Sequence, residues 1–310
     1  MKYRQLGKTG LKVSVVGLGT WQFGGEWGKD FSQKEVDEII QTSKDVGINF
    51  IDTAECYGDH LSEKFIGESV KATRTDWLIA TKFGHHFHGL MNRDRDYSAQ
   101  GMIAQLEASL KALQTDYIDL YQFHSGPDEA LRNDDLWTAL EKQVQAGKIR
   151  HLGISIGKTL DHEKQLQIAS KLPVETVQLE YNRLHLLPEE KALPLCEEHQ
   201  YGVLARVPLA SGYLSGKYAP GASFAANDVR IHHNREEVKR KLEEVEKIKK
   251  EEVPKGIDMS QWALAWCLRH PAVTMVIPGC KSPQQVVANA KASEIAEFVH
   301  QNHPQAVENV

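Results

Sequence analysis

The chain has 310 residues, 41% hydrophobic and 25% charged, which is enough to bury a sizeable core in one large domain or two ordinary ones. Its formal net charge of -5 argues against a nucleic-acid partner, because neutralising a phosphate backbone requires a clustered basic face. Without an apolar run of about eighteen residues or the apolar core of a secretory signal, the sequence predicts a cytoplasmic protein with no membrane partner. We therefore expect a small molecule as the partner.

Short apolar runs rich in β-branched residues recur along the chain and predict eight strands. Ahead of them, a Gly-Lys-Thr-Gly turn between two extended pieces predicts an N-terminal β-hairpin that covers the bottom of the fold. In chain order the predicted strands are Val13–Leu18, Ile48–Ile51, Leu78–Thr81, Tyr117–Phe123, Ile149–Ile154, Val174–Leu179, Val203–Val207 and Val273–Ile277.

Segments with helical spacing separate most of these strands. In the first segment, Ser32 and Glu35 form a capping box and Gly47 ends the helix, while Ser98 and Asn133 are the expected caps of the next two. Two further helices are expected outside the alternation, over residues 235–252 and 293–301. The segment 235–252 is highly charged with a narrow apolar stripe, which is typical of a surface helix.

The alternation of strand and helix predicts parallel strands joined by right-handed crossovers. Eight such units close into a (β/α)8 TIM barrel, so we expect residues 1–310 to form a single barrel domain with an N-terminal β-hairpin and extra helices. A doubly wound open sheet is the competing architecture. No G-x-G-x-x-G follows the first strand, so a Rossmann version of that sheet would lack its phosphate-binding turn.

Four chemically active side chains follow three neighbouring strands of the predicted barrel. Asp52, Lys82 and His124 end the second, third and fourth strands, and Tyr57 lies in the loop after the second, so all four share one rim. A phenol has a pKa near 10, which a nearby Lys82 ammonium lowers, while Asp52 keeps that ammonium protonated. With His124 bonding a substrate oxygen, the arrangement predicts an acid directed at a carbonyl. Because no side chain supplies a hydride, the reaction requires a cofactor.

Seven motifs occur in an order that resembles the aldo-keto reductase superfamily, specifically its bacterial branch, nearly from end to end. They are IDTAECYG, ATKFG, DYIDLYQFH, HLGISI, VQLEYN, VPLASGYLSGKY and VIPGCKSPQQVVANA. The resemblance implies an NADP-dependent oxidoreductase that reduces aldehydes or ketones to alcohols by hydride transfer from nicotinamide. It implies Tyr57 as the general acid, Lys82 and Asp52 as the pair that tunes it, and His124 as the residue that orients the carbonyl.

The resemblance also implies a set of cofactor contacts. Ser155 and Gln178 match the residues that hold the nicotinamide carboxamide, and Arg206 occupies the place of a ring that stacks on the nicotinamide. Ile156 departs from the family, which usually has Asn there. Lys281 favours a 2'-phosphate and hence NADPH (NADP+), with NADH also possible. The remaining cofactor-binding residues are Leu209, Ser211, Gly212, Leu214, Ser215, Lys217, Gly279, Ser282, Gln285 and Asn289.

An aromatic pocket for apolar carbonyl substrates is expected from Trp21, Phe83 and His85, while Trp27 is expected only to pack its own loop. Two other functions remain open. One is a metal-assisted barrel hydrolase using His85, His86 and His88 with Asp52, although no carboxylate pair accompanies them and we expect no metal. The other is a nicotinamide-binding redox sensor with negligible turnover. The sequence leaves the substrate and the oligomeric state open.

Overall fold

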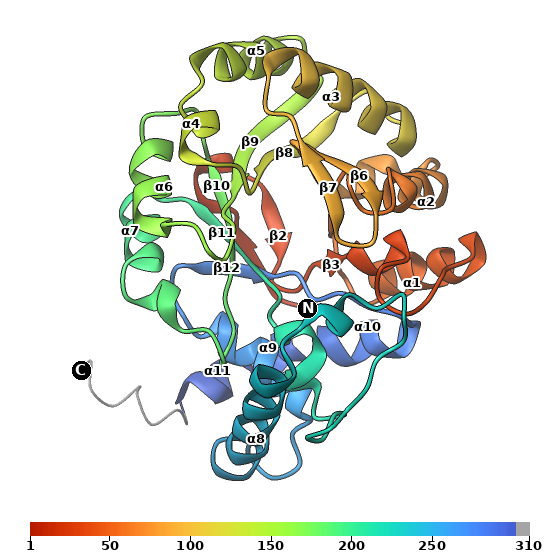
Figure 1. The fold of residues 1–310 in the computed structure, drawn as a ribbon, viewed down its shortest axis with the longest axis vertical. Helices are drawn as coiled ribbons and strands as arrows, with labels where there is room; N and C mark the ends of the chain where they lie inside the picture. Colours follow the sequence, from red (N-terminus) through yellow and green to blue (C-terminus); the bar gives the residue numbers. More distant parts are fainter. Residues whose placement is uncertain (302–310) are drawn as a thin grey trace.

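The computed structural model describes residues 1–301 and contains an eight-stranded parallel sheet that curls into a barrel, with helices around the outside (Figure 1). The sheet closes on itself because the amides of Gly17 and Gly19 donate to the carbonyls of Val276 and Pro278, at 2.8 and 3.0 Å. The predicted (β/α)8 barrel is therefore confirmed. Around the sheet the strands are β3 (Leu18–Gly19), β4 (Phe50–Asp52), β5 (Leu78–Phe83), β8 (Ile118–His124), β9 (Ile149–Ser155), β10 (Thr176–Glu180), β11 (Gly202–Arg206) and β12 (Val273–Val276).

The helices alternate with these strands, and the two extra helices expected from the sequence are joined by a third, the four-residue α4 (Asp128–Leu131), which precedes α5 between β8 and β9. Helix α8 precedes α9 between β11 and β12, and α11 follows α10 at the end of the described chain. The helices are α1 (Gln33–Asp45), α2 (Leu61–Val70), α3 (Ala99–Leu113), α4 (Asp128–Leu131), α5 (Asp134–Gln145), α6 (His162–Ala169), α7 (Ala192–Glu198), α8 (Arg235–Glu251), α9 (Met259–Leu268), α10 (Pro283–Ala290) and α11 (Ala292–Gln301). Short 3-10 helices lie at Gly7–Thr9, Trp21–Gly24, Arg74–Asp76, Leu187–Glu189, Ala210–Ser215 and Val229–His232.

The helix ends follow the predicted capping chemistry. Ser32 and Glu35 form the reciprocal capping box at the start of α1, and Gly47 adopts a φ of 83° just beyond its end. The side chains of Ser98 and Asn133 accept backbone N–H bonds at the starts of α3 and α5. Among residues 1–301, no helix combines the length and the apolar character needed to cross a bilayer.

The N-terminal hairpin pairs β1 (Tyr3–Gln5) with β2 (Lys12–Ser14) and closes the bottom of the barrel. Leu6 and Val13 are fully buried in a cluster with barrel residues such as Phe50. The predicted first strand, residues 13–18, is in fact divided between the hairpin and β3. An apolar run indicates burial but not which neighbour the backbone pairs with, so the sequence did not locate this division.

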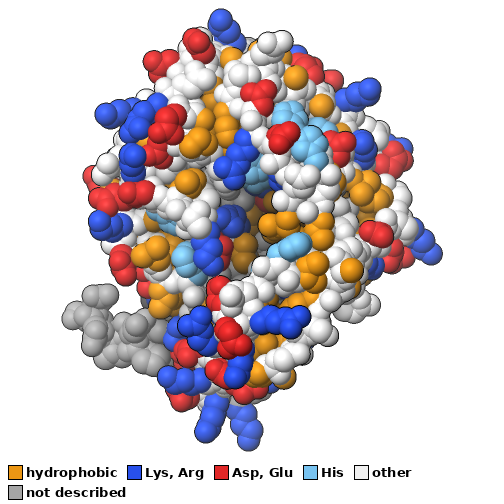
Figure 2. Space-filling view, viewed as in Figure 1, with side chains coloured by type: hydrophobic (Ala, Val, Ile, Leu, Met, Phe, Trp, Pro, Cys, Tyr) orange, Lys and Arg blue, Asp and Glu red, His pale blue; other side chains and the backbone are white. Residues whose placement is uncertain are grey.

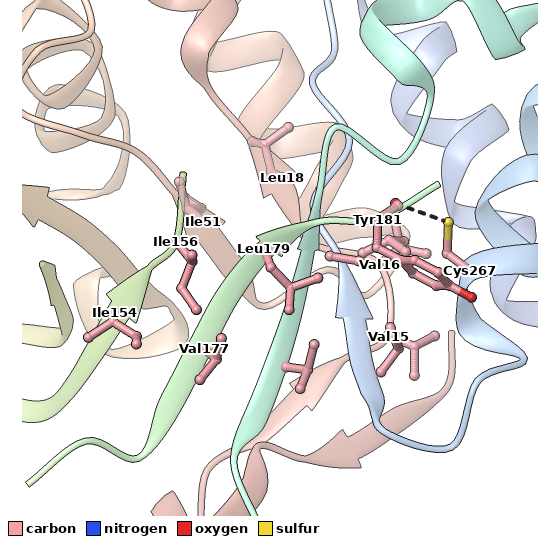
Figure 3. Packing of buried hydrophobic residues seen from close by; sticks show 14 of the residues in the cluster. Val15, Val16, Leu18, Ile51, Ile154, Ile156, Val177, Leu179, Tyr181 and Cys267 are labelled. Carbon is pink, nitrogen blue, oxygen red and sulfur yellow. Dashed lines mark hydrogen bonds between the residues drawn. The ribbon is translucent and has the colours of Figure 1, made fainter. Parts of the chain in front are cut away.

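The side chains that point outward from the barrel pack beneath the helices. Figure 3 shows Ile51, Val177 and Leu179 in this layer, with Tyr181 accepting a hydrogen bond through its carbonyl from the Cys267 thiol at 3.5 Å. Ile156 is fully buried in the same cluster. The dense layer holds the strand ends rigidly, which is what positions the residues that follow them.

The segment after β5 forms a hairpin rather than a simple loop. Its strands, β6 (His85–Gly89) and β7 (Asn92–Arg95), pair antiparallel and place Arg95 opposite His85. The hairpin stands apart from the barrel sheet (Figure 1).

Candidate active site

The carboxyl ends of the barrel strands surround a cavity of about 750 Å³. Its walls come from the loops after β3, β4, β11 and β12, from the β6–β7 hairpin, and from residues at the ends of β8 and β10. Figure 2 shows the molecule hollowed near its centre, with cationic, histidine and apolar side chains around the hollow. This is the rim at which barrel enzymes carry their chemistry.

A buried ion pair lies at the base of this cavity. The Nζ of Lys82 is 2.9 Å from the Asp52 carboxylate and 2.7 Å from the carbonyl of Thr53. The amides of Gln178 and Gln122 donate to the second oxygen of Asp52, at 2.8 and 3.3 Å. Burial lowers the pKa of Lys82, but the neighbouring Asp52 and Tyr57 outweigh it and raise that pKa above its ordinary value. Lys82 is therefore an ammonium throughout the neutral range.

Tyr57 lies above this pair. Its ring stacks on Trp21 with centroids 5.8 Å apart, and the Lys82 Nζ is 5.2 Å from its centroid. Burial raises the pKa of Tyr57 to about 12, although the Lys82 charge acts in the opposite direction. The sequence-based prediction that Lys82 lowers this pKa below 10 is therefore wrong, because the burial of the ring is the larger effect. The phenol consequently remains protonated and able to donate.

His124 is backed by a buried acid that the sequence analysis missed. Its Nδ1 lies 3.2 Å from Glu55 Oε1 and 3.9 Å from the Cys56 thiol, and its ring stacks on His85 at 4.2 Å. Burial raises the pKa of Glu55 and lowers that of His124 well below its ordinary value. Burial thus favours the uncharged form of both groups. Glu55 lies inside the motif IDTAECYG, so its position was visible, but its burial was not.

The residues proposed for a metal-assisted hydrolase do not converge. Asp52 is bonded to Lys82, and His88 pairs with Asp94 at 2.8 Å on the exposed hairpin. Donor atoms of another set, Glu55, Cys56, His85 and His124, lie within 4.8 Å of one another. The rings of His85 and His124 are stacked at 14°, so their nitrogen lone pairs run in nearly parallel planes rather than toward one point.

The other end of the cavity has the features of a dinucleotide site. A Cβ added to Gly19 would meet the backbone carbonyl of Ile277 at 2.6 Å, so only glycine fits there, and one added to Gly279 beside it would have to displace the Gln22 side chain. Helix α10 begins behind the Ser282 cap, and Ser282, Gln284 and Gln285 at this helix start line the cavity. The cations that line this side of the cavity are Arg206, Lys217, Arg230 and Lys281. Glycine cradle, helix start and cations together fit a phosphate-bearing cofactor.

Comparison with known proteins fits this site. A model of the aldo/keto reductase family matches residues 15–308. The chain belongs to the aldo/keto reductase family. It is 31% identical to the aldo-keto reductase YhdN of Bacillus subtilis over 306 residues, 93% of this chain and 87% of that protein. It is 32% identical to a probable voltage-gated potassium channel subunit beta of Arabidopsis thaliana, over 95% of this chain and 92% of that protein.

Solved aldo-keto reductases share the fold over almost the whole chain. The holo form of the reductase AKR11C1 from Bacillus halodurans has a TM-score of 0.79 and 31% identity, covering 100% of this chain and 98% of its own. Glycerol dehydrogenase AKR11B4 from Gluconobacter oxydans has a TM-score of 0.78 and 28% identity, covering 99% and 96%. Membership of this family supports an oxidoreductase that acts on small carbonyl compounds with a nicotinamide cofactor.

Most residues that the aldo/keto reductase resemblance assigned to the cofactor line the cavity. Two do not: Leu214 is fully buried in the core, and Ser155 is buried at the end of β9. Leu214 falls outside the wall because its side chain packs in the hydrophobic core, whereas Ser155 is 2% exposed and pairs in register with Gln178, which does line the cavity. The residues that do line it are Gln178, Arg206, Leu209, Ser211, Gly212, Ser215, Lys217, Gly279, Lys281, Ser282, Gln285 and Asn289.

The loop after β11 carries backbone strain beside the cofactor side of the cavity. Val207, Ala210 and Ser211 have φ values of 53°, 48° and 60°, in a region that residues with a Cβ rarely adopt and that is least favourable for a β-branched one. Such conformations cluster at functional sites, where the surrounding structure imposes them. Asn182 holds the Val207 carbonyl with its amide at 3.0 Å.

The substrate side of the pocket differs from the expectation at several positions. Trp21 and His85 line the cavity as expected. Trp27 was expected only to pack its own loop, but it also lines the cavity, and its ring meets Trp21 edge-on at 5.1 Å. Phe83 does not, because it is fully buried against Tyr121 at 5.0 Å. Successive residues of a strand face opposite sides, so Lys82 points into the barrel and Phe83 points out. The hairpin supplies residues that the sequence analysis did not name: Met91, Arg93 and Arg95.

Proposed function

We propose that this protein is an NADPH-dependent reductase that converts aldehydes or ketones to alcohols, with the whole chain acting as one catalytic domain. The supporting observation is that the phenol of Tyr57, the buried Lys82–Asp52 pair and His124 meet at one cavity whose other walls fit a dinucleotide. The relation to solved aldo-keto reductases adds to this support.

NADPH, when bound, would supply the hydride that no side chain can supply. The residues that would hold its nicotinamide end are Gln178 and Arg206, at the ends of β10 and β11. Lys281 and the start of α10, with Gln285 and Asn289, would hold the adenosine end and its 2'-phosphate. Ile156 is buried in the core and offers no hydrogen bond in place of the usual Asn.

Tyr57 acts as the general acid. In the proposed reaction its hydroxyl gives a proton to the carbonyl oxygen as the carbonyl is reduced. The phenolate left behind would carry a buried negative charge, which the Lys82 ammonium beside the ring stabilises. Asp52 holds Lys82 in place and keeps it charged through the 2.9 Å contact.

His124 orients the carbonyl through its free nitrogen. Burial favours the protonated form of Glu55, and in the proposed arrangement its O–H donates to His124 Nδ1 over 3.2 Å. The hydrogen of the neutral imidazole then lies on Nε2, which is free to donate to the carbonyl oxygen. Glu55 thereby acts as a positioning residue that fixes the tautomer of His124.

Replacing Tyr57 by Phe tests the proposal. We expect the rate of aldehyde reduction, followed by NADPH absorbance, to fall about 10²- to 10⁴-fold, because the general acid is lost. The affinity for NADPH, measured by fluorescence titration, should remain close to that of the parent. Tyr201→Phe, the same change at a residue outside the cavity wall, serves as the control. A Y57F variant that reduces aldehydes at the parental rate refutes the assignment.

A second candidate is a nicotinamide-binding regulatory protein with negligible turnover. It is favoured by the relatives named as potassium channel beta subunits in Arabidopsis thaliana and Oryza sativa, at 32% and 29% identity. The two functions differ in steady-state rate. Tight NADPH binding without oxidation of NADPH across a broad panel of aldehydes and ketones would select the regulatory function.

A further inference from the structure

Two arginines of the β6–β7 hairpin line the cavity at a place that the proposed mechanism leaves unused. Arg93 and Arg95 are two residues apart on β7, so their side chains leave the same face of the strand. Both reach the cavity wall. The cations assigned to the cofactor follow β11 and β12, whereas this hairpin follows β5. These two charges therefore belong to the carbonyl side of the site.

The guanidinium of Arg93 is held in place by neighbouring side chains. Its guanidinium bonds the Glu26 carboxylate at 2.6 Å, and the same carboxylate oxygen accepts the indole N–H of Trp21 at 2.7 Å. The guanidinium also lies 6.0 Å from the Trp21 ring, which stacks on Tyr57. The Nε of Arg93 is buried without a hydrogen-bond partner among residues 1–301. Arg93 thus fixes the aromatic wall beside the general acid and keeps one donor unused.

Arg95 is an uncompensated charge. Within the described part of the chain, no carboxylate lies within ion-pairing distance of its guanidinium, since Asp94 pairs with His88 and Asp96 bonds the amide of Ser98. Arg95 pairs across the hairpin with His85, which stacks on His124. Burial lowers the pKa values of both histidines, and the positive charge of Arg95 adds to this effect. The positive charge of Arg95 therefore acts on His124, the residue proposed to bind the carbonyl oxygen.

We infer that this end of the cavity binds a carboxylate, and that the substrates are carbonyl compounds bearing an acid group at the end opposite to the carbonyl. The inference rests on the proposed reductase function. The planar guanidinium fork matches a carboxylate in two parallel hydrogen bonds, and the rings of Trp21 and Trp27 with Met91 supply an apolar wall for the carbon skeleton. The inference adds a charged end to the apolar carbonyl substrate expected from the sequence.

A matched pair of aldehydes tests the charge preference. For the parent protein we expect kcat/KM for para-formylbenzoate to exceed that for its methyl ester by about 10- to 100-fold, the range of a charge-assisted hydrogen bond. Arg95 is exposed, so Arg95→Gln should lower the preference about tenfold, chiefly through KM. Arg95→Lys should restore part of it, because charge remains but the fork is lost. Arg240→Gln removes the same charge from the outer helix α8 and should leave the preference unchanged.

A binding measurement keeps the inference separate from the reductase function. Para-methylbenzoate carries the acid but no carbonyl, and its affinity for the NADPH-loaded protein can be measured by calorimetry. Arg95→Gln should weaken this binding about tenfold, and Arg240→Gln should not. If neither aldehyde is turned over, the proposed function fails while this measurement still decides the carboxylate site. Equal para-methylbenzoate binding by the parent and Arg95→Gln, or an undiminished preference for the acid in Arg95→Gln, overturns the inference.

Discussion

Replacing Lys82 by Met tests whether the buried ion pair beneath Tyr57 acts as a unit. The two charged atoms are 2.9 Å apart, and Lys82 and Asp52 are 0% and 3% exposed. At an effective dielectric constant of about 20, such charges attract by about 6 kcal/mol, which burial of both groups partly offsets. Met leaves Asp52 buried without a cation, so we expect a loss of about 3–5 kcal/mol in the free energy of unfolding.

The thermal shift follows from the size of the chain. An unfolding entropy of about 2.1 cal/mol/K per residue gives roughly 0.65 kcal/mol/K for 310 residues, so Tm should fall by about 5–8 °C. The double variant Asp52→Asn, Lys82→Met removes the orphaned charge and should be more stable than Lys82→Met alone, in urea unfolding followed by circular dichroism. Both variants should be inactive. If the destabilisations of Lys82→Met and Asp52→Asn, each measured alone, simply add in the double variant, the reasoning is wrong.

Two further predictions concern the cofactor and pH. Lys281→Ala should weaken NADPH binding about tenfold more than NADH binding in fluorescence titrations, because only NADPH carries the 2'-phosphate; equal weakening would remove that role from Lys281. The pKa of His85 is lowered by burial to about 3, against roughly 6.5 unfolded, so the unfolded chain binds the extra proton between these values. The contribution of His85 to stability is full above pH 6.5 and is lost toward pH 3, at up to about 1.4 kcal/mol per pH unit. His85→Asn should therefore lose stability less steeply than the parent between pH 6.5 and 4.5, and identical slopes in urea unfolding would contradict the assignment.

The barrel and the four central residues could be predicted because both depend on periodicity. Parallel strands end at one rim, so Asp52, Lys82 and His124 had to lie near one another once three strand ends were located. The order of the motifs then identified the family, and the cofactor side followed from the same order.

The sequence-based predictions failed where they depended on side-chain orientation and burial, which the periodicity of the sequence does not determine. A shift of one position along β5 turns Phe83 from the cavity into the core. The pKa of Tyr57 depends on how completely its ring is enclosed, and the role of Glu55 depends on its burial. The β6–β7 hairpin is polar and short, so nothing in its composition distinguished it from a loop, and its two arginines stayed unnoticed.

The contact between β3 and β12, which closes the barrel, links ligand binding to the stability of the whole barrel. Its last joint is made by the two-residue strand β3 and the backbone just beyond β12, which brings together the first and last quarters of the chain. Gly19 and Gly279 form a bridge across this joint, and both also line the cavity. A ligand lying over the two glycines spans the joint and is bound only while the ring stays shut. A bound ligand should therefore stabilise the closed barrel, so that Tm rises with dinucleotide concentration by mass action.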